Sequence, residues 1–217
     1  MCWNADISLN TFVFACLSMV FVYVANTFTK YKVPGVDAKL YLAMAIVASV
    51  QLVEFFLWKN IKNPARNEFF SKILASIIAL QPLALVLMIP NPSFRYFMLL
   101  ALAACTILFM ALKKDPIPFH VSVGKNGHLS WHWLNYKGPW LFLFVTFFYG
   151  VSLYAINHFR LSLFIFMIYA ISMFNYFKYS KFETVGSMWC WSSNIFFLAL
   201  ILEILLIKPY QEYGSLC

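Results

Sequence analysis

Long apolar runs separated by short polar breaks make up most of this chain. A helix needs about 20 mostly apolar residues to cross the hydrocarbon core of a bilayer. Breaks rich in Lys, Asn and Pro are typical helix ends, and Lys208-Pro209 is expected to end the last run. The pattern predicts an all-α polytopic membrane protein with seven transmembrane helices in one domain, residues 1–217. The predicted spans are 8–28, 38–58, 70–90, 94–112, 139–158, 160–178 and 186–207.

One segment between the fourth and fifth runs follows a different pattern. Residues 118–134 alternate between apolar and polar positions on both sides of a turn that contains Lys125 and Gly127. This alternation predicts a β-hairpin between helices 4 and 5. A three-residue loop with Gly127 in the left-handed conformation keeps one face entirely apolar. The cross-strand pairs expected from that register are Phe119 with Trp133, Val121 with Trp131 and Val123 with Leu129.

Three histidines fall on the other face of the predicted hairpin. His120 is expected to face His132 across the strands, with His128 further along the same face. One interpretation is a metal or proton site, because opposed side chains can share a ligand. The other is a wet polar face on a hairpin whose apolar residues contact lipid or the helix bundle. No cysteine or carboxylate joins the histidines locally, so the pattern favours the wet face and we expect no bound metal.

Composition agrees with a membrane protein and excludes several other classes. The chain is 63% hydrophobic and only 11% charged, whereas soluble domains are nearer half apolar and a quarter charged. The net charge of +8 is expected to reside in loops near an anionic leaflet, and we expect no nucleic-acid partner. The five cysteines are unclustered, which indicates neither a disulfide framework nor a zinc site. No cofactor is expected.

The distribution of Lys and Arg predicts the orientation. With seven spans, ten of the 16 basic residues fall on the side of the N-terminus and six on the opposite side. Cytoplasmic loops are usually enriched in basic residues, so the N-terminus is expected to be cytoplasmic. The pattern does not indicate which membrane holds the protein.

Polar groups inside the apolar runs are the candidate functional residues, because ionisable groups in hydrocarbon are costly. Gln51 and Glu54 are three residues apart and share one helix face. In the bilayer, these two residues are expected to lie at about the same depth as the polar beginning of the last span, and Gln81 is expected to lie deeper. The alternative is that these groups only hold the helices together. The predicted ligand-binding residues are Gln51, Glu54, Gln81, Trp191, Ser192, Ser193 and Asn194, around a pocket open toward the N-terminal side.

Four motifs resemble a set of uncharacterised multi-pass membrane proteins of large DNA viruses of algae and other protists. They are MCWN at 1–4, QLVEFFLW at 51–58, LQP at 80–82 and MWCW at 188–191. The resemblance implies no known activity. It implies that Gln51, Glu54, Gln81 and the Trp189–Asn194 stretch belong together as distinguishing features.

Three functions fit these observations. The leading one is a transporter or channel for a small polar solute, a cation or a proton, with its site at Glu54. The second is a structural protein of a viral or organellar membrane, which could be oligomeric. The third, an intramembrane enzyme, lacks a recognisable nucleophile–base pair in the sequence, so we expect no enzymatic activity and no catalytic residues. In each case the lipid bilayer is the expected partner.

Overall fold

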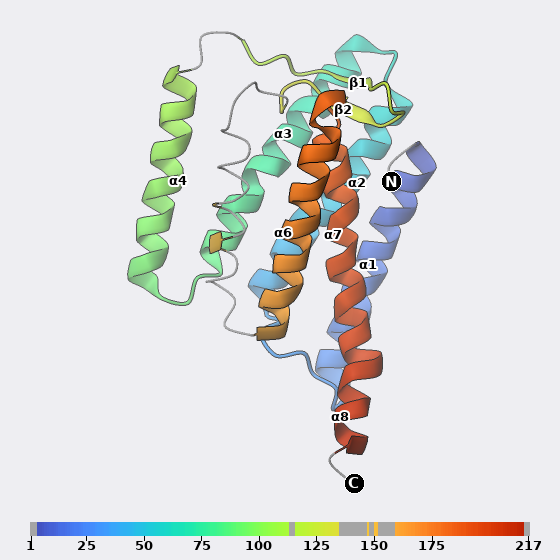
Figure 1. Ribbon diagram of the computed structural model, residues 1–217, viewed down its shortest axis with the longest axis vertical. Helices are drawn as coiled ribbons and strands as arrows, with labels where there is room; N and C mark the ends of the chain where they lie inside the picture. The colour runs from blue at the N-terminus through green and yellow to red at the C-terminus, as the bar shows by residue number, and fades with distance from the viewer. Residues whose placement is uncertain (1–3, 113–115, 135–146, 148–149, 152–158, 215–217) are drawn as a thin grey trace.

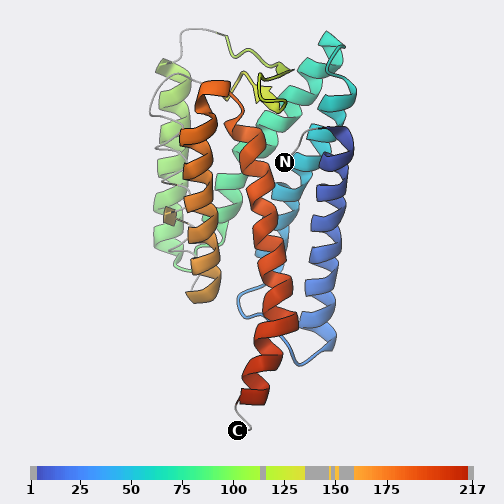
Figure 2. The ribbon, with the colours of Figure 1, turned by 45° about the vertical axis from the view of Figure 1, so that its right-hand side comes forward.

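The computed structural model describes residues 4–112, 116–134, 147, 150, 151 and 159–214. Long helices run in both directions along one common axis, and a short hairpin lies at the end that holds the N-terminus (Figures 1 and 2). The predicted span 139–158 falls almost entirely outside the described residues. The elements are α1 Ala5–Phe28, α2 Ala38–Lys59, α3 Pro64–Leu87, α4 Pro92–Leu112, β1 Val121–Val123, β2 Leu129–Trp131, α6 Phe159–Tyr179, the 3-10 turn Ser180–Phe182, α7 Val185–Leu202, the π turn Glu203–Ile207 and α8 Lys208–Gly214.

Side-chain caps explain where the first helices begin. The side-chain oxygens of Asn4, Asp37 and Asn63 each accept a hydrogen bond from the backbone N–H three residues later. Such caps satisfy donors that have no partner within the helix. With Asn63 as its cap and Pro64 in its first turn, α3 begins six residues earlier than the predicted span 70–90.

The last helix continues beyond its predicted end. We expected Lys208-Pro209 to end it, but α7 passes through the π turn Glu203–Ile207 into α8, which contains Pro209. Proline lacks an N–H group, and its ring clashes with the carbonyl four residues earlier in a regular helix. The wider π turn immediately before it relieves this conflict, so the helix continues to Gly214.

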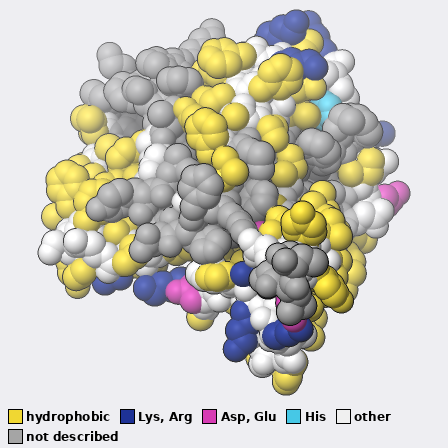
Figure 3. All heavy atoms as spheres, turned by 60° about the horizontal axis from the view of Figure 1, so that its bottom comes forward, with side chains coloured by type: hydrophobic (Ala, Val, Ile, Leu, Met, Phe, Trp, Pro, Cys, Tyr) yellow, Lys and Arg dark blue, Asp and Glu magenta, His cyan; other side chains and the backbone are white. Residues whose placement is uncertain are grey.

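Four helical segments in the described part of the chain are long and apolar enough to cross a membrane. They are α1, α2, α3 and Asn194–Tyr213, and α4 contains a shorter apolar stretch, Pro92–Leu108. Large apolar side chains also point outward, for example Leu17 at 64% exposure and Leu100 at 72%. Hydrophobic side chains are spread over the surface in Figure 3, with Lys and Arg gathered in small groups. By length and composition, this is a membrane protein.

The hairpin has the predicted register. Val121 pairs with Trp131 and Val123 with Leu129 in an antiparallel ladder, and Gly127 has a φ of 78°. The alternating pattern and the position of glycine therefore predicted both the pairing and the turn correctly. The paired strands are three residues each, shorter than the predicted hairpin 118–134, although His132 N–H also donates to the His120 carbonyl.

The hairpin is part of the packed core. Its apolar side chains Val121, Leu129 and Trp131 form one cluster with buried residues of α2 and α3. The expectation of a wet polar face is wrong for β2, since Ser130 is 2% exposed and His128 beside it is 4% exposed. The ring of His128 lies edge-on to Tyr179 at the end of α6, so this part of the polar face is covered as well. The buried α2 and α3 residues of the cluster are Val50, Val53, Leu57, Leu74 and Ile78.

A glycine in α7 makes room for the hairpin. A Cβ atom on Gly186 would lie 2.3 Å from Cε3 of Trp131, whose ring is 1% exposed. Real side chains do not approach so closely, so the indole occupies space that a glycine leaves open. The first turn of α7 can therefore rest directly on the hairpin.

Replacing Gly186 with alanine is expected to lower the stability of the protein by about 1 to 3 kcal/mol, because the added methyl group overpacks a rigid ring. The thermal unfolding midpoint in detergent checks this. The matched control is Gly150→Ala, since a Cβ atom on Gly150 meets nothing within 4 Å. Equal midpoints for the two variants would contradict the close packing of Trp131 against α7.

Candidate functional site

The candidate site begins with the side chain that holds the hairpin to α3. The amide of Asn67 donates to the Val121 carbonyl at 2.9 Å and accepts from the Val121 N–H at 2.8 Å. Asn67 is 3% exposed, and the Ser71 hydroxyl donates to the same amide oxygen at 3.3 Å. The ladder does not use the backbone groups of Val121, because that residue belongs to a non-hydrogen-bonded pair. The amide of Asn67 therefore substitutes for a neighbouring strand.

A second connection joins the hairpin turn to the beginning of α7. The Asn126 amide donates to the Thr184 hydroxyl at 2.8 Å, and Thr184 is fully buried. A Cβ atom on Gly124 would lie 2.7 Å from the Thr184 methyl group, so the backbone passes close to this residue. The hairpin is thus held on both sides, by α3 and by α7.

Two of the predicted site residues are buried together under the hairpin. Glu54 is 0% exposed and Gln51 is 1% exposed, and both lie on α2. Thr11 of α1 donates to the Gln51 amide oxygen at 3.0 Å. At 1.5 Å per residue, Glu54 and Gln51 lie roughly 8 and 12 Å from the end of α2. Together with Ser71 of α3, which is also 0% exposed, they form a polar layer that is closed to solvent in this conformation.

The remaining predicted site residues are distributed differently. Asn194 is partly exposed and lies roughly 14 Å from the beginning of α7, at the depth of Gln51. Gln81 is 6% exposed but lies roughly 25 Å along α3, well below the polar layer, because α3 begins at Pro64. Trp191, Ser192 and Ser193 belong to α7, but their side chains are outside the described part of the structure.

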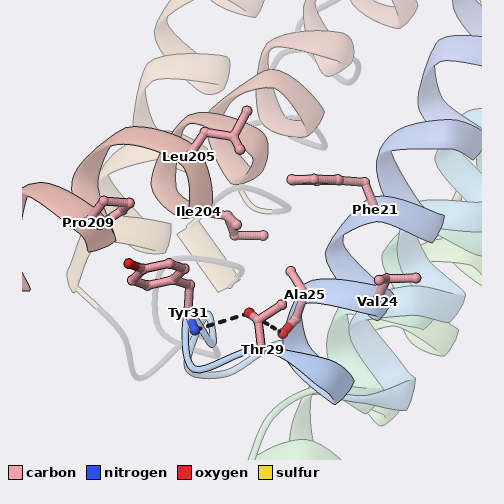
Figure 4. A pocket seen from close by; sticks show the side chains of 8 residues that line it. All are labelled: Phe21, Val24, Ala25, Thr29, Tyr31, Ile204, Leu205 and Pro209. Atoms are coloured by element: carbon pink, nitrogen blue, oxygen red, sulfur yellow. Dashed lines mark hydrogen bonds between the residues drawn. The ribbon is translucent and has the colours of Figure 1, made fainter.

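The hollow that the described residues enclose near the end of the last helix does not coincide with the predicted pocket. An apolar hollow of about 230 Å³ lies near the opposite end, between α1 and the π turn (Figure 4). Phe21, Ile204 and Leu205 line it, and none of the predicted site residues does. The predicted pocket around Glu54 therefore remains a prediction, and the described geometry is that of a sealed polar layer.

The hairpin also carries a cluster of polar side chains on its outer part. The rings of His120 and His132 are stacked, with their centroids 4.2 Å apart. Nε2 of His132 lies 2.7 Å from the Ser122 hydroxyl, and Nδ1 lies 3.6 Å from a carboxylate oxygen of Glu183. The described residues include no group of three or more His, Cys, Asp or Glu placed to hold a metal. The predicted approach of His120 to His132 is confirmed.

Sequence reasoning missed the contributions of Ser122 and Glu183 to this cluster. A signal for Ser122 was present, because the predicted register makes it a diagonal neighbour of His132 on the same face. Glu183 had no comparable signal, since the turn before α7 brings it near the hairpin from 51 positions away in the chain.

The environment of His132 lowers its pKa below the ordinary value of 6.5. Burial disfavours the charged ring most strongly, the neighbouring His120 opposes a second positive charge, and Glu183 acts in the opposite direction. The neutral ring is therefore the form that suits this packing.

Replacing Asn67 with alanine is expected to destabilise the protein by about 2 to 4 kcal/mol, because two hydrogen bonds are lost and buried backbone groups lose their partner. Thermal unfolding in detergent measures this, and Asn60→Ala is the control because the hydrogen bonds of its amide lie at the exposed surface. If Asn67→Ala lowers the unfolding midpoint no more than Asn60→Ala does, the strand-like role of the Asn67 amide is contradicted.

Stability is expected to fall as the pH drops below about 6.5. Because the pKa of His132 is lower in the folded state, the unfolded chain takes up a proton there at a higher pH than the folded protein does. Acid therefore favours unfolding until the pH has fallen below the pKa of the folded state. Unfolding midpoints measured from pH 8 to pH 5 check this. The decrease should be smaller in His132→Gln, and an identical decrease in both proteins would contradict the assignment.

No family model, curated protein or solved structure matches this chain. The resemblance to multi-pass proteins of large DNA viruses therefore stays a prediction.

Proposed function

We propose that this protein is an integral membrane transporter or channel that passes a proton, a cation or a small polar solute through a site at Glu54. The observation that carries the proposal is a fully buried carboxyl group inside helices apolar and long enough to span a bilayer. Acidic groups at such positions are costly and commonly mark proton or ion pathways.

The surroundings of Glu54 support this role. Gln51 on the same helix lies in contact with Thr11 of α1, and Ser71 of α3 lies at a similar depth. Hydroxyl and amide groups of this kind can orient a solute or exchange hydrogen bonds with a carboxyl group that gains or loses a proton. In the proposed cycle the structure represents an occluded state, since Glu54 is 0% exposed.

The proposal includes seven passes, with the N-terminus in the cytoplasm. α4 and α6 include the predicted spans 94–112 and 160–178 and run in the same direction, as two helices separated by one further pass would (Figure 1). Outward-facing Ile107 and Phe177 are 69% and 70% exposed, which suits lipid contact. The enrichment of basic residues on the N-terminal side supports the orientation.

A second candidate function is a structural role in a viral or organellar membrane. The closure of Glu54 beneath a firmly held hairpin favours it, because a scaffold needs no path for solutes. In that case the buried amides and hydroxyls serve only to fix helix packing.

Flux measurements in liposomes test the proposal. Wild-type protein is expected to carry protons or monovalent cations, and Glu54→Gln is expected to abolish the flux because the amide cannot exchange a proton or carry charge. The control is Glu68→Gln, since Glu68 is exposed and paired with Lys72. Elution profile and melting temperature confirm that all three proteins are folded.

Each outcome of this experiment is informative. Flux in the wild type and in Glu68→Gln, but not in Glu54→Gln, supports transport through Glu54. Equal flux in all three proteins contradicts the role of Glu54. No flux in any of them contradicts transport of these ions and favours the structural role.

A further inference from the structure

An imidazole lies between a hydroxyl and a carboxylate at the outer part of the hairpin. Nε2 of His132 is 2.7 Å from the Ser122 hydroxyl, and Nδ1 faces Glu183 at 3.6 Å. The order of atoms is that of a nucleophile, a general base and an orienting acid. The contact to Glu183 is longer than a hydrogen bond, as contacts between catalytic groups often are before a substrate binds.

Three segments bring these groups together and hold them in place. Ser122 lies at the centre of β1, His132 directly follows β2, and Glu183 precedes α7. Asn67 fixes the residue before Ser122, and Trp131 is locked beneath Gly186 immediately before His132. The cluster thus has a supporting layer of buried contacts on both strands.

Glu183 adds an independent sign of a constrained site. Its φ is 58°, in the left-handed region that a residue with a side chain seldom adopts. Such strain persists only where the surrounding structure imposes it, and it is common at functional sites. Here the conformation places the carboxylate beside the imidazole.

From this geometry we propose that Ser122, His132 and Glu183 form an acyl-transfer site that acts on carboxylic esters. The proposal goes beyond transport and does not rest on it, since Glu54 takes no part. Sequence reasoning expected no enzymatic activity because it found no nucleophile–base pair, whereas the folded hairpin brings one together.

The reaction balances without a further reagent except water. The Ser122 hydroxyl oxygen attacks the ester carbonyl while its proton moves to Nε2 of His132. The tetrahedral intermediate then expels the alcohol, which takes that proton, and leaves an acyl group on Ser122. Water, deprotonated by the same imidazole, attacks the acyl group and releases the acid, which restores the serine.

Nearby groups suit this chemistry. The lowered pKa of His132 leaves the ring neutral near pH 7, so it can accept the proton. Val123 directly follows the nucleophile in the chain. Like Val121, it belongs to a non-hydrogen-bonded pair, so its backbone N–H points out of the ladder. It is the candidate donor to the oxyanion.

The position of the site indicates how the ester reaches it. Glu183 is 55% exposed and His120 is exposed, so the cluster lies on the surface at the N-terminal end of the helices. A headgroup-level ester of a membrane lipid and a soluble ester can both approach such a surface. The shared chemistry is the carboxylic ester, and the experiment separates the two sources.

Covalent labelling tests the proposal on the full-length protein in nanodiscs. A fluorophosphonate probe is expected to modify Ser122, located by mass spectrometry of the digested protein. His132→Gln is expected to slow labelling roughly 100-fold or more, because a general base contributes about that much. Ser122→Ala should abolish it, and Ser76→Ala, which removes an exposed hydroxyl on α3, should leave it unchanged.

A second measurement distinguishes the source of the ester and guards against misfolding. Fatty-acid release from phosphatidylcholine nanodiscs and hydrolysis of p-nitrophenyl acetate are compared in wild type and Ser122→Ala, with melting temperatures recorded for each variant. Loss of either activity in folded Ser122→Ala supports the site and identifies a lipid or a soluble ester. An unlabelled Ser122, labelling unaffected by His132→Gln, or activities equal in both proteins would overturn the proposal.

Discussion

The two hydrogen bonds between the Asn67 side chain and the backbone of Val121 are the interaction on which the arrangement depends. A two-stranded hairpin alone is marginally stable, and its outer edge carries backbone groups that need partners when buried. Asn67 supplies both partners from α3. With the backbone of Val121 satisfied, the hairpin can bury Trp131 against α7, where Gly186 leaves room for the ring. A loop between helices thereby becomes part of the core.

Both proposed sites lie next to the docked hairpin. On its inner side the hairpin packs in one cluster with α2 residues on either side of Glu54, whose carboxyl group is closed to solvent in the present conformation. Further out, the same strands carry Ser122 and His132, which a loose loop would not hold at 2.7 Å. One packing arrangement thus supports a closed polar layer in the bundle and an ordered cluster at its surface.

Local patterns predicted much of this fold, and contacts between distant segments account for the rest. The alternation of apolar and polar residues and the position of Gly127 were sufficient to predict the hairpin register. The apolar runs predicted the location of most helices. The burial of both faces of β2 could not be foreseen, because it depends on where the beginning of α7 lies. The continuation past Pro209 depends on a π turn that composition does not reveal. Of the candidate site, Gln51 and Glu54 were singled out as polar positions in an apolar run, and the structure shows both buried, whereas the role of Asn67 needed the structure.

Hydrogen–deuterium exchange at the Val121 amide in nanodiscs tests the docking of the hairpin most directly. Because this N–H donates to a buried side chain, the account predicts exchange as slow as that of amides in the middle of α2 and α3. The exposed turn at Lys125 should exchange far faster in the same sample. Exchange of Val121 at the rate of Lys125 would show a hairpin detached from the bundle and would contradict the account.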